Sequence, residues 1–244
     1  MTSLIQKHPL QRLPSPDRGI SAFVHLIGLS SFAYSWKFLI ENDHLANDAY
    51  GWHFAFLTVI GLFLATLTFL ASLLADITLS RRLFLVKNML SICSAPIEVL
   101  ISLLYWGLRL YDKHLVIPEG HSISLEADLN FHLVPFVVML VDLLFLSPPW
   151  TITAVAAMGL SGCLAVAYWF WVEKCYQENG WYPYPIFELL DTRSRIGLFA
   201  VSAFLMTVNT LTLKHLYGRL NGFGRSERSQ ARPGDVKKDD YHQK

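Results

Sequence analysis

Charged residues are scarce in this chain: Asp, Glu, Lys and Arg make up 16% of its 244 residues, whereas hydrophobic residues make up 53%. A water-soluble domain of this size needs more charge to cover its surface, so the shortage excludes an ordinary soluble fold. The net charge is only +1, which gives no reason to expect a nucleic-acid partner. The composition instead predicts a polytopic membrane protein.

Cysteine is also scarce, and three common sequence signals are missing. The three cysteines have neither the spacing of a disulfide framework nor that of a metal site, and we expect no metal or organic cofactor. The first 19 residues contain no apolar run, which excludes a cleavable signal peptide. The chain has no N-glycosylation signal and no internal repeat. The missing glycosylation signal, together with short loops, favours the endoplasmic reticulum over the cell surface.

The chain does, however, contain long apolar stretches. A helix needs about 20 apolar residues to cross the hydrocarbon core. Six stretches qualify, at 20–40, 52–76, 83–109, 129–147, 150–172 and 195–217. The sequence therefore predicts an all-α bundle of six transmembrane helices over 20–217, with a short polar segment (1–19) before it and a disordered basic tail (218–244) after it. The short connector "SPPW" predicts that the fourth and fifth spans are antiparallel neighbours.

The distribution of basic residues predicts the orientation of the bundle. Six spans put both termini on one side, and that side carries most of the Lys and Arg residues outside the spans. The first loop on the opposite side, "ENDHLANDAYG", has none. Cytosolic loops are enriched in Lys and Arg, so we expect both termini in the cytosol.

The second span carries a stripe of small and polar residues that includes Thr58. Stepping by three and four from Ala55 gives Thr58, Gly61, Ala65 and Thr68 on one face. Such a face packs against neighbouring helices, so Thr58 points into the bundle. The span predicted from residue 52 puts Thr58 six residues in, about 9 Å below the non-cytosolic end. Its hydroxyl either bonds the carbonyl four residues earlier or acts as a nucleophile.

The fourth span carries His132 near the same end of the bundle. The two spans enter from the same side, so Thr58 and His132 are expected at similar depth and can meet only if their helices are adjacent. An intramembrane histidine is a candidate functional residue, although it can also simply bond a backbone carbonyl. Asp128 lies one turn earlier and either contacts His132 or caps the helix.

Four segments together resemble the androgen-induced-protein family of multi-span membrane proteins, in particular its fungal-type members. They are "FLTVI" in the second span, "APIEVLISLLYWGL" in the third, "LNFHLVPFVVMLVDLLFLSPPW" in the fourth and "GWYPYPIFELLD" before the sixth. The resemblance implies a membrane threonine hydrolase that cleaves fatty acid esters of hydroxy fatty acids. It implies Thr58 as the nucleophile and His132 as the base. The chain departs from the vertebrate pattern in having fewer residues between this histidine and the next proline.

The hydrolase hypothesis gives supporting roles to other residues. An oxyanion formed at Thr58 needs a donor, for which Asn130, His53, Tyr182 or a backbone N–H are candidates. Glu98, deep in the third span, either bonds a neighbouring helix or orients a histidine. The aromatic, proline-containing loop "NGWYPYPIFELLD" is a candidate lid. The expected partners are the lipid ester substrate and bilayer lipid, and no oligomeric state is predicted.

A non-enzymatic bundle is the competing hypothesis. In a small transporter or receptor-like protein, Glu98, Asp142 and Asn209 would line a pathway across the membrane midplane. The lack of an internal repeat and of paired broken helices argues against common transporter plans. A third possibility is an inactive scaffold, in which the stripe of the second span only packs helices.

Overall fold

The computed structural model describes residues 18–42, 44–117, 123–148 and 150–221, and these contain helices but no strand. The predicted segments 1–19 and 218–244 lie mostly outside the described residues. Five helices are long and apolar enough to cross a membrane, and a bent helix pair gives up to six spans. The all-α, polytopic architecture predicted from the sequence is therefore confirmed.

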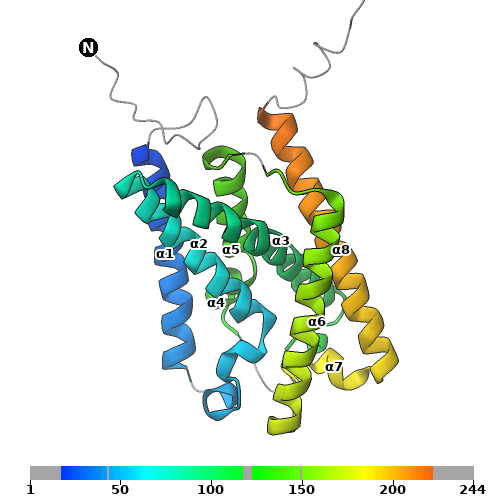
Figure 1. Cartoon of the computed structure of the whole chain (residues 1–244). Coiled ribbons are helices and arrows are strands. Elements are labelled where there is room, and N and C mark those ends of the chain that lie inside the picture. Colours follow the sequence, from blue (N-terminus) through cyan, green and yellow to red (C-terminus); the bar gives the residue numbers. More distant parts are fainter. Residues whose placement is uncertain (1–17, 43, 118–122, 149, 222–244) are drawn as a thin grey trace, which may run out of the picture.

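The long helices are α1 (Arg18–Glu41), α2 (Leu57–Thr78), α3 (Arg81–Tyr111), α6 (Ala154–Asn179) and α8 (Thr192–Asn221). The bent pair consists of α4 (Leu125–His132) and α5 (Val134–Val141), and a π-helical turn, η4 (Asp142–Leu146), continues it. The short elements η1 (Leu45–Asp48), η2 (Trp52–Ala55), η3 (Lys113–Leu115) and α7 (Pro185–Leu189) lie in the connecting loops. The start of α1 and the end of α8 are at the same end of the bundle (Figure 1).

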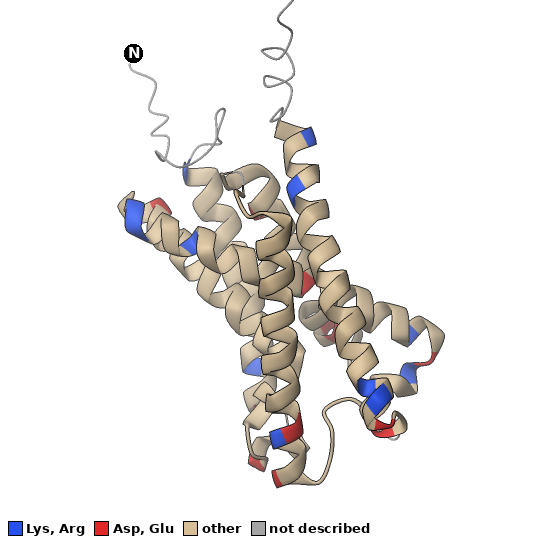
Figure 2. Ribbon diagram, turned by 45° about the vertical axis from the view of Figure 1, so that its right-hand side comes forward, with Lys and Arg blue, Asp and Glu red and all other residues tan. Residues whose placement is uncertain are grey.

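The bundle has two parts that join along α3. In the first part, α2 packs closely against α1 and α3, and the bent pair packs against all three. In the second part, α6 packs mainly against α8, and α8 packs against α3. The fourth predicted span corresponds to the bent pair and the fifth to α6. The expected pairing of these two spans is wrong, because α6 packs mainly against α8. Figure 2 shows long helices that are largely uncharged, with Lys, Arg, Asp and Glu mainly toward their ends.

Small residues allow α2 to approach both of its neighbours. A Cβ atom added to Gly28 of α1 would lie 2.3 Å from the ring of Phe69, and one added to Gly61 of α2 would lie 2.5 Å from Ile101 of α3. Neither position has room for a larger side chain. The buried core around α2 is formed by residues such as Phe32, Leu62, Phe69, Ala95 and Met139. This packing fixes the position of the first turn of α2.

The fourth span is interrupted close to His132. Pro135 has no N–H to donate and its ring disfavours a straight helix through the preceding turn. Leu133 adopts φ −128° and ψ −49°, and the two half-helices bend by 40°. The indole N–H of Trp106 donates to the His132 carbonyl at 3.3 Å. The break therefore makes His132 the last residue of α4, at the C-terminal end of that helix.

A buried group of charged residues ties four helices together at the end of the bundle where α1 begins. Lys87 Nζ lies 2.6 Å from Asp142 Oδ1. The His25 ring lies between two carboxylates, with Nδ1 2.7 Å from Asp76 Oδ2 and Nε2 2.8 Å from Asp142 Oδ1. With both ring nitrogens protonated, His25 donates to each carboxylate, and the group then has two positive and two negative charges. We call His25, Asp76, Lys87 and Asp142 the buried ion cluster.

Candidate active site

Thr58 occupies the first turn of α2, closer to the helix end than the sequence indicated. The helix begins at Leu57, and the preceding residues 52–55 form the separate turn η2. The predicted depth of six residues within the span is therefore wrong, because the residues before Leu57 are not part of the helix. The first N–H groups of a helix lack intrahelical partners and carry a partial positive charge. Thr58 thus sits where a developing negative charge is stabilised.

The hydroxyl of Thr58 differs from the others in α2. Those of Thr66, Thr68, Ser72 and Thr78 each donate to the carbonyl four residues earlier, at 2.6–2.7 Å. Thr58 Oγ1 instead lies 3.4 Å from the phenol oxygen of Tyr184. The Thr58 backbone N–H donates to that oxygen, also at 3.4 Å. The back-bonded interpretation therefore describes the other hydroxyls of the helix, whereas Thr58 faces a side chain from the loop before α8.

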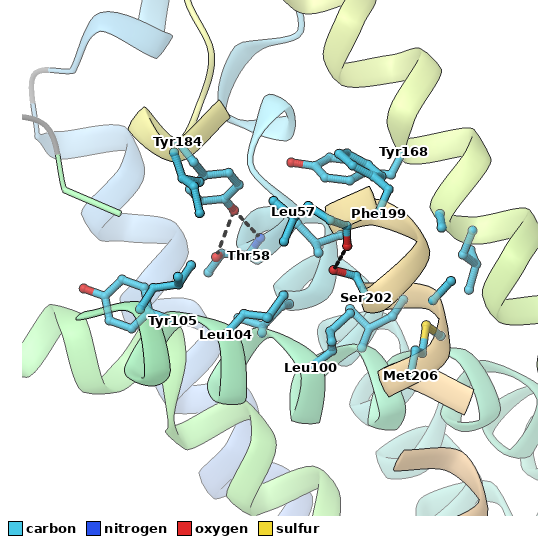
Figure 3. Close-up of a pocket in the computed structure, with 18 of the residues that line it drawn as sticks. Leu57, Thr58, Leu100, Leu104, Tyr105, Tyr168, Tyr184, Phe199, Ser202 and Met206 are labelled. Carbon is cyan, nitrogen blue, oxygen red and sulfur yellow. Dashed lines mark hydrogen bonds between the residues drawn. The ribbon is translucent and has the colours of Figure 1, made fainter. Parts of the chain in front are cut away.

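Two cavities meet at Thr58. The first, the apolar cavity, has a volume of about 120 Å³ and lies between α2, α3, α6 and α8. Its walls include Leu100, Leu104, Phe199, Ala203 and Met206. Figure 3 shows Thr58 and Tyr184 facing each other beside the apolar side chains of Leu100 and Leu104. This cavity offers a hydrocarbon chain a place that ends at the Thr58 hydroxyl.

The second cavity is larger, at about 500 Å³, and most of its wall is apolar, but we call it the polar cavity because three imidazoles line it. Its walls include the imidazoles of His44, His53 and His132 together with Asn42 and the aromatic residues of the loop 181–184. Thr58, Tyr105, Val116 and Tyr184 line both cavities. Thr58 therefore stands at the junction of an apolar and a mixed, wider space.

His132 is held in one orientation inside the polar cavity. Its Nδ1 lies 3.0 Å from Asp128 Oδ1 and 3.1 Å from the Asp128 carbonyl. Its ring stacks on Tyr105 with centroids 3.4 Å apart and an interplanar angle of 2°. With Nδ1–H donating to Asp128, Nε2 is the nitrogen that can accept a proton. This is the arrangement of a general base with an orienting carboxylate.

The carboxylate of Asp128 has a partner of its own. Arg109 of α3 forms an ion pair with Asp128 and donates to the Tyr105 hydroxyl at 3.0 Å. Ser124, not Asp128, caps α4, because its hydroxyl accepts the Ala127 N–H. Of the two roles the sequence left open for Asp128, the structure therefore shows contact with His132. Arg109, Asp128 and His132 form a chain of contacts that leads into the polar cavity.

Thr58 and His132 face the same cavity from helices that are in contact. α2 packs against α4, so the adjacency that the sequence left open is present. Among the hydrogen bonds of the described residues none joins the two side chains directly. Catalytic hydrogen bonds often tighten only when a substrate is bound.

The loop between α6 and α8 carries Tyr184 to Thr58. Tyr182 donates from its hydroxyl to Glu173 at 3.0 Å, and Arg195 lies 3.5 Å from the same carboxylate. Arg195 also donates to the carbonyls of Phe187 and Leu190. These contacts hold α7 and the residues before it against α6 and α8. Burial raises the pKa of Tyr184, so its phenol keeps its proton and can donate it.

The supporting residues predicted from the sequence divide into two pairs. His53 and Tyr182 line the polar cavity. Burial and the neighbouring His44 lower the pKa of His53 to about 4, and its Nε2 lies 2.7 Å from Asn47 Oδ1. Burial and Glu173 raise the pKa of Tyr182 to about 12. His53 is therefore a neutral imidazole and Tyr182 a neutral phenol at physiological pH.

The other pair, Asn130 and Glu98, is not among the residues that line either cavity. Asn130 accepts a hydrogen bond from Ser31 of α1 at 2.5 Å and so faces the opposite side of α4 from His132. Glu98 is buried in α3 beside Gly61, and its Oε1 has no hydrogen-bond partner. Neither can donate to an oxyanion at Thr58 or orient His132. These two assignments are corrected by the structure.

Tyr184, Tyr105 and Arg109 had no assigned part in the sequence-based site, although all three contact its central residues. Tyr184 belongs to the aromatic segment "WYPYP", which was the one signal that pointed to it. Among the described residues, no group of three His, Cys, Asp or Glu side chains is placed to hold a metal ion. Glu98, Asp142 and Asn209, the residues of the transporter hypothesis, line neither of the two cavities.

Comparison with known proteins agrees with the resemblance noted in the sequence. A relative from Schizosaccharomyces pombe, called UPF0641 membrane protein, is 32% identical over 206 residues, covering 83% of this chain and 92% of its own. No solved structure matches the chain. The model of the family described as FAR-17a/AIG1-like protein matches residues 20–218, which include all but the first two residues of α1 and the last three of α8, and the lining of both cavities. Matched over almost all of its membrane domain, this chain belongs to the FAR-17a/AIG1-like family.

Proposed function

We propose that this protein is a membrane hydrolase that cleaves lipid esters through an acyl-threonine intermediate on Thr58. One observation carries the proposal. The hydroxyl of Thr58 is not bonded to its own helix and stands where an apolar cavity meets a polar cavity that contains an oriented histidine. A lipid ester has the same division, with an acyl chain on one side of the carbonyl and an alcohol on the other.

In the first half of the reaction, His132 Nε2 takes the proton of Thr58 as Oγ1 attacks the ester carbonyl. The negative charge that forms on the carbonyl oxygen is stabilised by donors, a contribution that is usually large. The Tyr184 hydroxyl and the Thr58 backbone N–H are the donors closest to Thr58 Oγ1. The alcohol then leaves with the proton held by His132, and Thr58 is acylated.

In the second half, water replaces the alcohol. His132 takes a proton from the water as its oxygen attacks the acyl-threonine carbonyl, and then returns that proton to Thr58 Oγ1. The net reaction consumes one ester and one water and yields one carboxylic acid and one alcohol. Asp128 and Arg109 act through His132 and hold its ring in the accepting orientation.

The proposal extends to the membrane and the orientation of the chain. The described residues near the start of α1 and the end of α8 include Arg18, Arg81, Arg82, Lys214 and Arg219. By the positive-inside rule this end faces the cytosol, so the site opens toward the other face, at the interface where amphipathic lipids lie. The endoplasmic reticulum is the membrane that the sequence favours.

Covalent labelling tests the proposal directly. The purified full-length chain, in a non-ionic detergent, is treated with a fluorophosphonate probe, digested and analysed by mass spectrometry. We expect the label on the peptide that contains Thr58, because this hydroxyl has a base and donors at hand. Modification of another side chain, or of none, would contradict the assignment of Thr58.

A second prediction concerns the length of the acyl chain. Ala203 lines the apolar cavity, so Ala203→Phe fills part of it. We expect the preference for a palmitoyl over a butyryl p-nitrophenyl ester to fall by about 10-fold or more, since several methylenes lose their place. Val201→Phe, on the same helix but at a side chain 55% exposed, is the matched control and should keep the preference. An unchanged preference in Ala203→Phe would show that the acyl chain lies elsewhere.

A further inference from the structure

Tyr105 of α3 covers one face of the His132 ring. The two ring centroids are 3.4 Å apart and the ring planes differ by 2°, so the rings lie directly one over the other. Tyr105 is 7% exposed and, like Thr58, lines both cavities. The nitrogens of His132 form hydrogen bonds in the plane of its ring, so the contact with Tyr105 leaves both of them accessible.

A face-to-face stack is not the arrangement that two neutral aromatic rings prefer. Their quadrupoles favour offset or edge-to-face pairs, because the face of each ring is electron-rich. The same quadrupole attracts a cation that lies over the ring face. The stack of His132 on Tyr105 therefore suits a positively charged imidazolium better than a neutral imidazole. In the proposed reaction His132 carries that charge after it takes the proton of Thr58.

Residues of α3 hold the Tyr105 ring in this position. Its hydroxyl accepts a hydrogen bond from Arg109 at 3.0 Å, and its ring makes an edge contact with Trp106 at a centroid distance of 5.4 Å. The indole N–H of Trp106 also donates to the His132 carbonyl. Two consecutive residues of one helix thus contact the ring and the backbone of His132. The stack is in place before the charge forms, so it costs no reorganisation during the reaction.

The charged groups beside His132 leave a need for this contact. The carboxylate of Asp128 faces His132 Nδ1, but it also forms an ion pair with Arg109. The positive charge of Arg109 opposes a second positive charge on the imidazole. Asp128 and Arg109 together are close to neutral, so they orient the ring and supply little net negative charge. The electron-rich face of Tyr105 is a further source of stabilisation for the imidazolium.

The geometry points to Tyr105 as a positioning residue for ester hydrolysis, whose ring holds His132 and stabilises the imidazolium that forms in both halves of the reaction. This inference rests on the proposed function and adds a residue to its mechanism. The aromatic ring is the essential part of the side chain, whereas the hydroxyl serves to orient it. Tyr105 acts through His132 and forms no bond with the substrate.

Kinetics of the full-length chain in non-ionic detergent at pH 8 test this role. With the butyryl p-nitrophenyl ester, Tyr105→Leu should lower kcat by about 10- to 30-fold and change KM by less than about 3-fold, because the lost contact forms with the charge on His132. Tyr105→Phe keeps the ring and should retain kcat within about 3-fold. Tyr111→Leu makes the same change on the same helix at a side chain 87% exposed, and should leave both constants unchanged.

A spectroscopic measurement tests the stack in the unmodified chain. In a sample with isotope-labelled histidine, the ring protons of His132 are identified by their absence in His132→Ala. We expect them upfield of the other histidine signals, because they lie over the Tyr105 ring. The upfield shift should persist in Tyr105→Phe and vanish in Tyr105→Leu.

The outcomes separate this inference from the proposed function. An unchanged kcat in Tyr105→Leu, a rise in KM alone, or His132 signals without an upfield shift would overturn the role of Tyr105 and leave the hydrolase proposal intact. An equal loss of kcat in Tyr105→Phe and Tyr105→Leu would also overturn it, since the ring would not be the essential part. No hydrolysis by the unmodified chain, with no fluorophosphonate label on Thr58, would overturn both.

Discussion

Thr58→Ala is expected to lower kcat/KM for a lipid ester by about 10⁴-fold or more, because it removes the atom that forms the covalent intermediate. Labelling by the fluorophosphonate probe should disappear with it. The fold should be unaffected, since Thr58 lies in the first turn of α2 and its hydroxyl makes only a long contact, 3.4 Å, with Tyr184. Hydrolysis and labelling, measured on the same preparation, check the prediction.

Two further variants distinguish a loss of catalysis from a loss of folding. Thr78→Ala makes the same change in the same helix, but at a hydroxyl that is bonded to the Leu74 carbonyl, so activity should persist. His132→Ala should match Thr58→Ala, and the double variant should be no worse than either single one, because the two act as a unit. Full activity in Thr58→Ala would end the nucleophile assignment, and additive losses in the double variant would show that His132 acts independently.

Lys87→Met is expected to produce the largest loss of stability. Lys87 and Asp142 are 2.6 Å apart and their side chains are 0% exposed. Removing one partner leaves a buried charge uncompensated, at a cost of about 3–5 kcal/mol in the free energy of unfolding. For a domain of this size that corresponds to a fall of about 10 °C in the midpoint of thermal unfolding. The midpoint is measured in detergent by size-exclusion chromatography after heating.

The chain offers a matched control for this change. Lys37 forms an ion pair with Glu41 at 3.7 Å, but its side chain is 68% exposed, so Lys37→Met should change stability by less than about 1 kcal/mol. The double variant Lys87→Met with Asp142→Asn should recover part of the loss, because His25 and Asp76 then balance each other. If Lys87→Met were as stable as Lys37→Met, the buried ion cluster would not be a determinant of stability.

Hydropathy predicted the number and approximate places of the spans. Burying a polar group in lipid costs much free energy, and that cost depends on the residues of the segment itself and not on distant parts of the chain. It did not predict where the second span begins. Residues 52–55 are as apolar as a helix requires, yet they form a 3-10 turn, and Phe56 adopts an extended conformation before α2. Backbone geometry at a helix end depends on the packing of the loop, which composition does not reveal.

The partners of the site could be predicted only in part. Thr58 and His132 share a leaflet by topology alone, but Tyr184 reaches Thr58 across 126 residues of sequence. The ion pair of Arg109 with Asp128 likewise depends on which helices are neighbours. Helical geometry could have excluded two assignments. Asn130 is two residues from His132, about 200° around the helix, so the two side chains cannot face the same cavity. Glu98 is about 10 Å deeper along α3 than Tyr105, which is the residue of that helix that lines both cavities.

The meeting of the two cavities at Thr58 also sets the order of events in the proposed reaction. The acyl chain attached to Thr58 occupies the apolar side, so the alcohol can leave and water can arrive only through the polar side. The first product must therefore depart before the second step begins, which is the condition for ping-pong kinetics. A second alcohol that enters in place of water takes the acyl group itself, so the same geometry supports transesterification as well as hydrolysis.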